Sequence, residues 1–354
     1  MSTSARSSSP QPVYQNDEAA SSWTRDLRTV RTVRFTLGTT VAAAIAYAFE
    51  WPLFFLTPVL TIAFLSLPLP GVTAGHWLKL LVYIAGAMLI GAALTFFVQN
   101  YPLIYVLLLG VVLFHIYYLV NRGGSFIFAL MSLLAVLLIP MLSSANATVG
   151  LGFAWYFALS AGLSVLIFAL AQVLLPDPVE TPAYESAFQR GYSATAARAA
   201  LKSTIAVLPL VVLFLSLELY GQILVMAFAA IFSLIPDLST GWAAGRRSLR
   251  STLLGCLAAI VFYWLLVAVP EFHFFLLLWS GAMLLFARLI FSEHPLAQYM
   301  GSAAIAMTIL VSGSIGPGAD FVDKLVTRVV LIMLATLWVV AAIALLDRYV
   351  FRQK

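Results

Sequence analysis

The stretch Pro236–Gly255, PDLSTGWAAGRRSLRSTLLG, is the most cationic segment between two hydrophobic runs, and an earlier stretch resembles it. That earlier stretch is Pro68–Gly86, PLPGVTAGHWLKLLVYIAG. In both, a short apolar run ends at proline and a glycine-containing polar loop with basic residues follows. A longer apolar run then reaches a small-residue step, at Ala85-Gly86 and at Gly255. We therefore interpret the chain as two tandem copies of one membrane unit.

Composition indicates a membrane protein. Hydrophobic residues make up 62% of the 354 residues and charged residues only 9%, against about 25% charged in a typical soluble domain. Several runs of roughly 15 to 22 residues carry no charge, which is about the length that crosses a hydrocarbon core as a helix. The sequence predicts an all-α polytopic membrane protein, with about 12 transmembrane helices arranged as two parallel six-helix repeats.

The order of segments predicts four regions. Residues 1–24 are rich in Ser and have no signal-peptide core, so we expect a disordered cytoplasmic tail. Residues 25–175 form the first six-helix repeat, 176–197 a cytoplasmic linker and 198–354 the second six-helix repeat. The expected spans are 35–49, 53–67, 78–98, 103–120, 126–142, 151–175, 204–219, 222–235, 249–269, 272–291, 296–311 and 325–346.

Counting these spans from a cytoplasmic N-terminus sorts the charges by side. All of the 19 Lys and Arg residues except Lys324 and Arg328 then fall on inner segments, whereas Glu50, Glu218 and Glu271 fall on outer ones. This bias follows the positive-inside rule. We expect a multi-pass protein of the bacterial inner membrane with both termini in the cytoplasm. Orientation also explains the net charge of +5, so we expect no nucleic-acid partner.

The two halves align beyond their topology. At a shift of about 168 residues, Glu50 aligns with Glu218 and Pro68 with Pro236. An even number of spans in each half leaves both copies in the same orientation. The sequence therefore predicts a symmetry axis along the membrane normal, with any transport pathway between the halves.

Three motifs carry a family resemblance. The first half has Arg34-Phe-Thr-Leu-Gly-Thr-Thr and Trp51-Pro-Leu-Phe-Phe-Leu-Thr57-Pro-Val, and the second has Gly245-Arg-Arg-Ser-Leu-Arg-Ser-Thr-Leu-Leu-Gly255. These resemble the fusaric acid resistance and aromatic acid exporter superfamily, with its basic first-span entry, Trp-x-x-Leu-Thr-like second span and Arg-x-x-Gly-Thr-x-x-Gly third-span entry. Ser251 departs from that pattern, and no large cytoplasmic domain separates the halves. The chain is thus similar to the compact, membrane-only branch, DUF2955.

The resemblance implies export of organic, often aromatic, carboxylates driven by the proton gradient, with a periplasmic membrane-fusion partner of the HlyD type. Plant malate channels, which are distantly similar, also conduct anions. A passive anion channel and an accessory membrane subunit of an efflux system therefore stay open as alternatives.

An enzyme is not expected. Cys256 is the only cysteine, and the four histidines have no metal-ligand spacing. We therefore expect no metal and no other cofactor, and the expected partners are a small organic anion and the lipid bilayer.

Basic residues at the inner ends of spans are the candidates for a substrate anion path. A set of guanidinium groups concentrates anions and binds carboxylates through paired hydrogen bonds. The competing explanation for these residues is the positive-inside bias itself. That bias explains Arg250 least, because Arg250 lies one turn deeper in its span than Arg246 and Arg247. Arg34 and Arg198 open the first span of each half, where we expect them to reach lipid phosphates. The anion-path candidates are Arg250, Arg247, Arg246, Lys79, Arg288 and Arg122.

Three titratable residues are candidates for proton coupling. Glu50 and Glu218 lie at the outer ends of the first and seventh spans, where a carboxylate can load a proton from outside. The alternative is a solvated helix end beside the interfacial aromatics Trp51 and Tyr220. His115 lies near the middle of the fourth span, where the alternative is a buried neutral histidine bonded to a backbone carbonyl.

Overall fold

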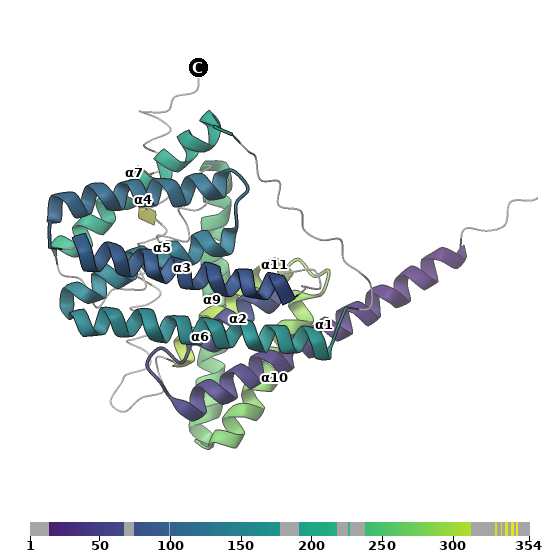
Figure 1. The fold of residues 1–354 in the computed structure, drawn as a ribbon. Helices are drawn as coiled ribbons and strands as arrows, with labels where there is room; N and C mark the ends of the chain where they lie inside the picture. The colour runs from purple at the N-terminus through teal and green to yellow at the C-terminus, as the bar shows by residue number, and fades with distance from the viewer. Residues whose placement is uncertain are drawn as a thin grey trace, which may run out of the picture.

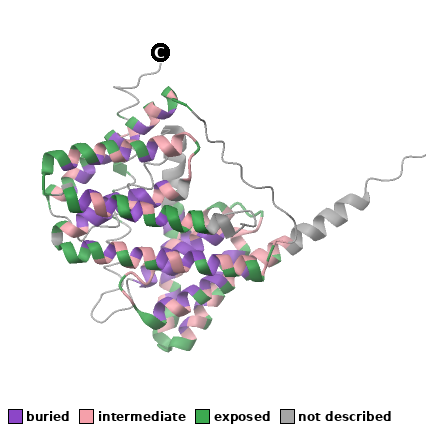
Figure 2. Cartoon of the chain, viewed as in Figure 1, coloured by how far each residue is buried: buried purple, intermediate pink, exposed green. Residues whose placement is uncertain are grey.

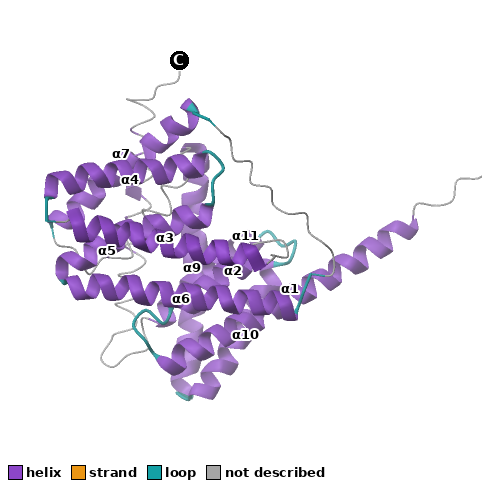
Figure 3. Ribbon diagram, viewed as in Figure 1, coloured by secondary structure: helices purple, strands orange, loops and turns teal. Residues whose placement is uncertain are grey.

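A computed structural model describes residues 14–66, 74–98, 100–177, 191–217, 226 and 238–312, together with 330, 334, 337, 338, 341, 342 and 345. Every regular element in these ranges is an α-helix (Figure 3). The helices are α1 (Tyr14–Phe49), α2 (Leu56–Ser66), α3 (Ala74–Val98), α4 (Pro102–Asn121), α5 (Phe126–Ala145), α6 (Ala147–Leu174), α7 (Ala194–Ser216), α9 (Leu238–Ala268), α10 (Phe272–Ile290) and α11 (Ala297–Ser312).

Seven helices in the described part of the chain are long and apolar enough to cross a membrane. They lie in α1, α3, α4, α6, α7, α9 and α10, whereas α2, α11 and the apolar part of α5 are shorter. The chain is therefore a polytopic helical membrane protein. The spans expected at 222–235 and 325–346 lie largely outside the described residues, and their few described positions are helical.

Local sequence explains where several helices begin. Ser125, Asn146 and Ser193 precede α5, α6 and α7, and each side chain accepts a hydrogen bond from a backbone N–H of the first turn. Pro102 occupies the first turn of α4, where no N–H donor is needed. The first helix differs from expectation, because α1 already begins at Tyr14, inside the segment for which we expected a disordered tail.

Helix packing shows a recurring pattern. The most extensive contacts are those of α3 with α5 and of α9 with α11, followed by those of α4 with α7 and of α1 with α10. Figure 1 shows α4 beside α7 and α1 beside α10. Suppose that α7, α9, α10 and α11 are the first, third, fourth and fifth helices of a second half. The third helix then contacts the fifth within each half, and the first helix of each half contacts the fourth helix of the other.

A glycine lies at each of the two most extensive contacts. A Cβ atom at Gly91 of α3 would lie 2.7 Å from the carbonyl carbon and oxygen of Ala135 in α5, and one at Gly255 of α9 would lie 2.5 Å from the carbonyl oxygen of Ala303 in α11. Only glycine permits such close backbone approach. In α3 the closely approached glycine is Gly91 and not Gly86, the glycine that the sequence comparison set beside Gly255, because a Cβ at Gly86 would meet nothing within 4 Å.

Buried side chains concentrate where the helices meet, and exposed ones cover the outer faces (Figure 2). The short helix α2 is the most enclosed element, since nearly all its residues from Thr57 to Leu65 are buried. It packs against α1, α6 and α11. Helix α2 therefore lies at the centre of the bundle, and α1 and α6 flank it.

Candidate functional site

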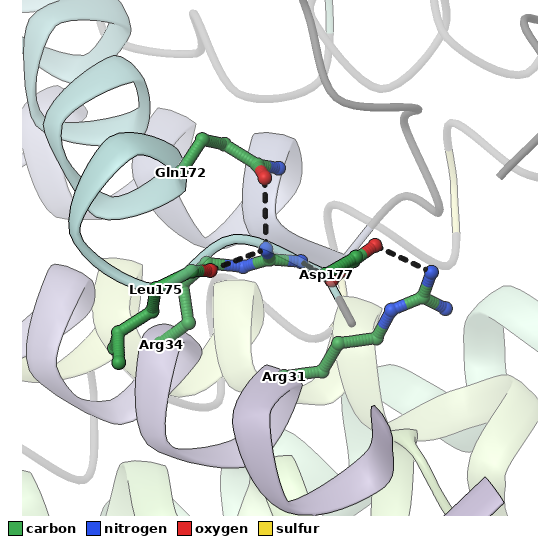
Figure 4. Close-up of polar contacts among 5 residues, drawn as sticks. All are labelled: Arg31, Arg34, Gln172, Leu175 and Asp177. Atoms are coloured by element: carbon green, nitrogen blue, oxygen red, sulfur yellow. Dashed lines mark hydrogen bonds and ion pairs between the residues drawn. The ribbon is translucent and has the colours of Figure 1, made fainter. Parts of the chain in front are cut away.

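Arg31, Arg34 and Asp177 form a buried charged cluster, which we call the Asp177 cluster, where α6 ends beside α1 (Figure 4). Asp177 Oδ2 accepts a hydrogen bond from Arg31 Nη2 at 2.9 Å, and Asp177 Oδ1 lies 2.9 Å from Arg34 Nη2. The side chains of Arg34 and Asp177 are only 7% and 6% exposed, and that of Arg31 is 16% exposed. Burial of three charged groups in so apolar a chain makes this cluster the principal candidate site.

Arg34 also binds the end of α6. Its Nη1 donates to Gln172 Oε1 at 2.8 Å and to the Leu175 carbonyl oxygen at 3.0 Å. Leu175 is the C-cap of α6, so the guanidinium group lies at the negative end of the helix dipole. We expected Arg34 to reach lipid phosphates, and this was wrong. The Arg34 guanidinium group instead contacts an amide oxygen of α6, the carbonyl oxygen of its C-cap and the carboxylate of Asp177, which follows α6.

The charges within the Asp177 cluster do not balance. Among the described residues, two guanidinium groups face one carboxylate, which gives these three side chains one formal positive charge in a largely buried place. Buried charges are costly unless they are paired and hydrogen-bonded. Arg31 Nε is buried and has no hydrogen-bond partner among the described residues. Asp177 Oδ1 is in an ion pair with Arg34 Nη2. The Arg31 Nε–H therefore retains capacity to donate to a further anionic or acceptor group.

Other basic residues lie near the connection between α10 and α11. Arg28, three residues before Arg31 on α1, forms an ion pair with Glu293. Arg250 of α9 donates from Nη1 to the hydroxyl oxygen of Tyr299 at 3.3 Å. Glu293 lies on this connection and Tyr299 in the first turn of α11, six residues later, so basic residues of α1 and α9 reach the same end of α11. Arg250 is thus placed at the same end of the bundle as the start of the α1 span.

A polar seam joins the start of α2 to α6. Trp51 Nε1 donates to Ser160 Oγ at 3.0 Å, and Ser164 Oγ donates to the Thr57 carbonyl oxygen at 2.9 Å. Ser160 and Ser164 are one turn apart on α6, so both face α2. The motif residues Trp51 and Thr57 therefore fix the central helix to its neighbour.

The remaining anion-path candidates are spread over separate helices. Arg247 lies three residues before Arg250 on α9 and is exposed, and Lys79 on α3 is exposed as well. Arg246 also belongs to α9, but its side chain lies outside the described part of the structure. No described contact joins Arg247 or Lys79 to the Asp177 cluster.

Arg122 and Arg288 occupy matching positions at the ends of α4 and α10. Arg122 is the C-cap of α4, and its guanidinium carbon lies 5.3 Å from the centre of the Tyr118 ring. Arg288 lies in the last turn of α10 and is exposed. A cation at a helix C-terminus is stabilised by the helix dipole. This effect explains both positions without a ligand.

The two described proton-coupling candidates, Glu50 and His115, have no described contact with the Asp177 cluster. Glu50 follows the last residue of α1, is exposed, and has a left-handed backbone with φ of +45°. His115 is on an exposed face of α4, where its Nδ1 lies 2.8 Å from the Val111 carbonyl oxygen. The expected bond to a backbone carbonyl is present, but the expected burial is not. Glu218 lies outside the described residues.

Sequence reasoning missed Asp177, Gln172, Ser160 and Ser164. One signal was available for Asp177, because it is the first acidic residue after Glu50 along the chain. Gln172 and the two serines carried no comparable signal, since single small polar residues are ordinary in membrane helices.

Fold and site together define a polytopic helical membrane protein with a buried arginine–carboxylate cluster at one end of the bundle. Residues 31–171 match the model of the family described as "Protein of unknown function (DUF2955)". The match begins at Arg31 and includes Arg34, but ends before Gln172 and Asp177. No curated protein and no solved structure matches the chain.

Proposed function

We propose that the protein exports organic, and in particular aromatic, carboxylates across the bacterial inner membrane. The observation that carries the proposal is the Asp177 cluster, in which the chain builds a buried place for a carboxylate between two guanidinium groups. Arginine is the side chain best suited to paired recognition of carboxylates. The DUF2955 model matches residues 31–171, and the exporter role itself comes from the resemblance of the sequence motifs.

The proposed architecture is a pair of parallel six-helix repeats, with about 12 spans in all. Its support is the recurrence of helix pairs: α3 with α5 and α9 with α11, and likewise α4 with α7 and α10 with α1. The closely approached glycines Gly91 and Gly255 support the same correspondence. In this arrangement the first helix of each half contacts the fourth helix of the other, and the proposed pathway follows this interface between the halves.

Within this proposal, Arg250 draws the anion toward the pathway from the cytoplasmic side, and both termini lie on that side. The test uses inside-out vesicles, in which export appears as uptake of labelled 4-hydroxybenzoate. Arg250→Ala should reduce that uptake. The matched control is Tyr299→Phe, which removes the hydrogen bond to Arg250 but keeps the charge. Equal loss in both variants would assign Arg250 a structural role, and no uptake by the unaltered protein would contradict the export function.

Coupling to protons is the second part of the proposal, with Glu50, Glu218 and His115 as the candidate carriers. An imposed pH gradient should increase uptake in the vesicles, and combined Glu50→Gln and Glu218→Gln should abolish that increase. Uptake that follows the pH gradient equally in the double variant would remove the role of the glutamates. A membrane-fusion partner of the HlyD type belongs to the same proposal.

One observation favours a passive anion channel as the alternative. The described helices α2 to α7 and α9 to α11 contain no Asp or Glu. A membrane potential of about 100 mV contributes about 2.3 kcal/mol per charge, which concentrates a monovalent anion outside by about fifty-fold without a proton. A channel would show uptake that follows the membrane potential and is unaffected by the pH gradient.

A further inference from the structure

We propose that Arg31 and Arg34 form the binding site for the carboxylate of the transported anion, and that Asp177 occupies this site when no substrate is bound. The ligand class is a small organic carboxylate carrying one negative charge. The inference rests on the proposed function, and it deepens that function by naming a binding site and a group that competes for it.

The hydrogen bonding of Arg31 is incomplete in a way that a free carboxylate can improve. Asp177 accepts a hydrogen bond from Arg31 Nη2 at Oδ2, and its Oδ1 forms an ion pair with Arg34 Nη2 at 2.9 Å. Arg31 Nε donates to no described acceptor. A guanidinium group presents Nε and one Nη along the same edge, and an untethered carboxylate can accept from both. A substrate carboxylate can therefore accept the Arg31 Nε–H hydrogen bond that Asp177 does not accept.

The charge of the cluster favours exchange of one carboxylate for another. With Asp177 bound, the two guanidinium groups share one negative charge from the described part of the chain. Withdrawal of Asp177 alone would leave two buried cations unpaired, which costs several kcal/mol. Arrival of a monovalent carboxylate as Asp177 leaves keeps the total charge constant. A neutral solute that replaced Asp177 would leave both guanidinium groups without a negative partner, so the cluster selects for anions.

The two arginines are held differently, which gives them different roles. Arg34 keeps its hydrogen bonds to Gln172 and to the Leu175 carbonyl when Asp177 departs, and it stays in place. Arg31 has its described hydrogen bond to Asp177 alone. Arg34 lies one turn deeper along α1 than Arg31. An anion captured by Arg31 can thus pass to Arg34 in one short step toward the membrane.

Asp177 can move without unwinding a helix. It follows the C-cap Leu175 and Pro176, in non-helical backbone. Its withdrawal breaks the contacts with the two arginines but leaves the hydrogen bonds of α6 intact. The cluster thus pairs a fixed receptor on α1 with a competing carboxylate on a non-helical segment.

The test measures binding of labelled 4-hydroxybenzoate to the purified full-length protein in lipid nanodiscs. Asp177→Asn removes the competing charge, so the dissociation constant should fall at least tenfold. The matched control is Glu293→Gln, which removes a carboxylate paired with Arg28 at an exposed position, and this variant should bind as the unaltered protein does. 4-Hydroxybenzamide, which lacks the negative charge, should not compete.

Arg31→Lys provides the second variant, because it keeps the charge but lacks the paired donors. It should weaken binding at least fivefold. If 4-hydroxybenzoate binds the unaltered protein and neither Asp177→Asn nor Arg31→Lys changes its affinity, the inference is wrong while the proposed function stands. Weaker binding in Asp177→Asn, with its unfolding temperature unchanged, also overturns the inference. If no organic carboxylate binds any variant, the proposed function fails together with the inference.

Discussion

Alanine at Gly91 or at Gly255 should destabilise the protein, and alanine at Gly86 should not. The new Cβ at Gly91 would lie 2.7 Å from backbone atoms of Ala135. The new Cβ at Gly255 would lie 2.5 Å from the Ala303 carbonyl oxygen. Because backbone atoms in a helix cannot rotate away as a flexible side chain can, α3 must separate from α5, or α9 from α11.

The size of the effect follows from two opposing terms. Ordinary contact begins at 3.4 Å, so each helix pair must separate by roughly 0.7 to 0.9 Å, and overpacking of this kind costs about 1–3 kcal/mol. Replacing a helical glycine by alanine gains about 0.5–1 kcal/mol. The net loss at Gly91 and at Gly255 should therefore be about 0.5–2 kcal/mol. At Gly86, where the Cβ meets open space, only the gain applies.

The assay is unfolding of the purified protein in mixed micelles, with all three variants measured against the unaltered chain. Gly86→Ala is the matched control for Gly91→Ala, because both positions lie on α3. Gly91→Ala and Gly255→Ala should lower stability by similar amounts if the two crossings are equivalent. Equal stability of Gly86→Ala and Gly91→Ala would refute the close crossing of α3 and α5. Lower stability in only one of Gly91→Ala and Gly255→Ala would refute the equivalence of the halves.

Three further changes test local features by the same unfolding assay. Glu50→Gly should stabilise the protein by about 1 kcal/mol, because glycine adopts the left-handed backbone without strain, and unchanged stability would argue against that conformation. Ser160→Ala should cost about 1–3 kcal/mol by leaving the Trp51 indole N–H unpaired, and no loss would mean that another acceptor replaces the serine. Arg34→Met should cost about 3 kcal/mol, and adding Asp177→Asn should recover part of that loss unless the two side chains are uncoupled.

The helices were largely predictable, because a run of apolar residues in a chain this poor in charge has few alternatives to crossing a membrane. The expected span at 103–120 lies within α4, and that at 272–291 nearly coincides with α10. The start of α1 was less predictable, since a polar Ser-rich segment has no apolar periodicity to indicate a helix. The crossing glycine of α3 could not be predicted either, because the sequence offers both Gly86 and Gly91 and does not indicate which one faces α5.

The candidate site was predicted only in part. Clustering of basic residues at span ends follows from the positive-inside rule, and the structure does bring Arg250 and the arginines of α1 to one end of the bundle. The pairing of Arg34 with Asp177 joins residues that are 143 positions apart. No local pattern encodes such a contact, which depends on α6 ending beside α1. Arg34 was consequently assigned to lipid phosphates instead of to a carboxylate of the same chain.

The most direct test of the account is transport by the purified protein in liposomes. Labelled 4-hydroxybenzoate should cross protein-containing liposomes faster than protein-free ones when a membrane potential draws the anion across. Excess unlabelled benzoate should suppress this flux, and benzamide should not. Flux equal to that of protein-free liposomes for a panel of aromatic and aliphatic carboxylates would contradict the conclusion that this protein transports organic carboxylates.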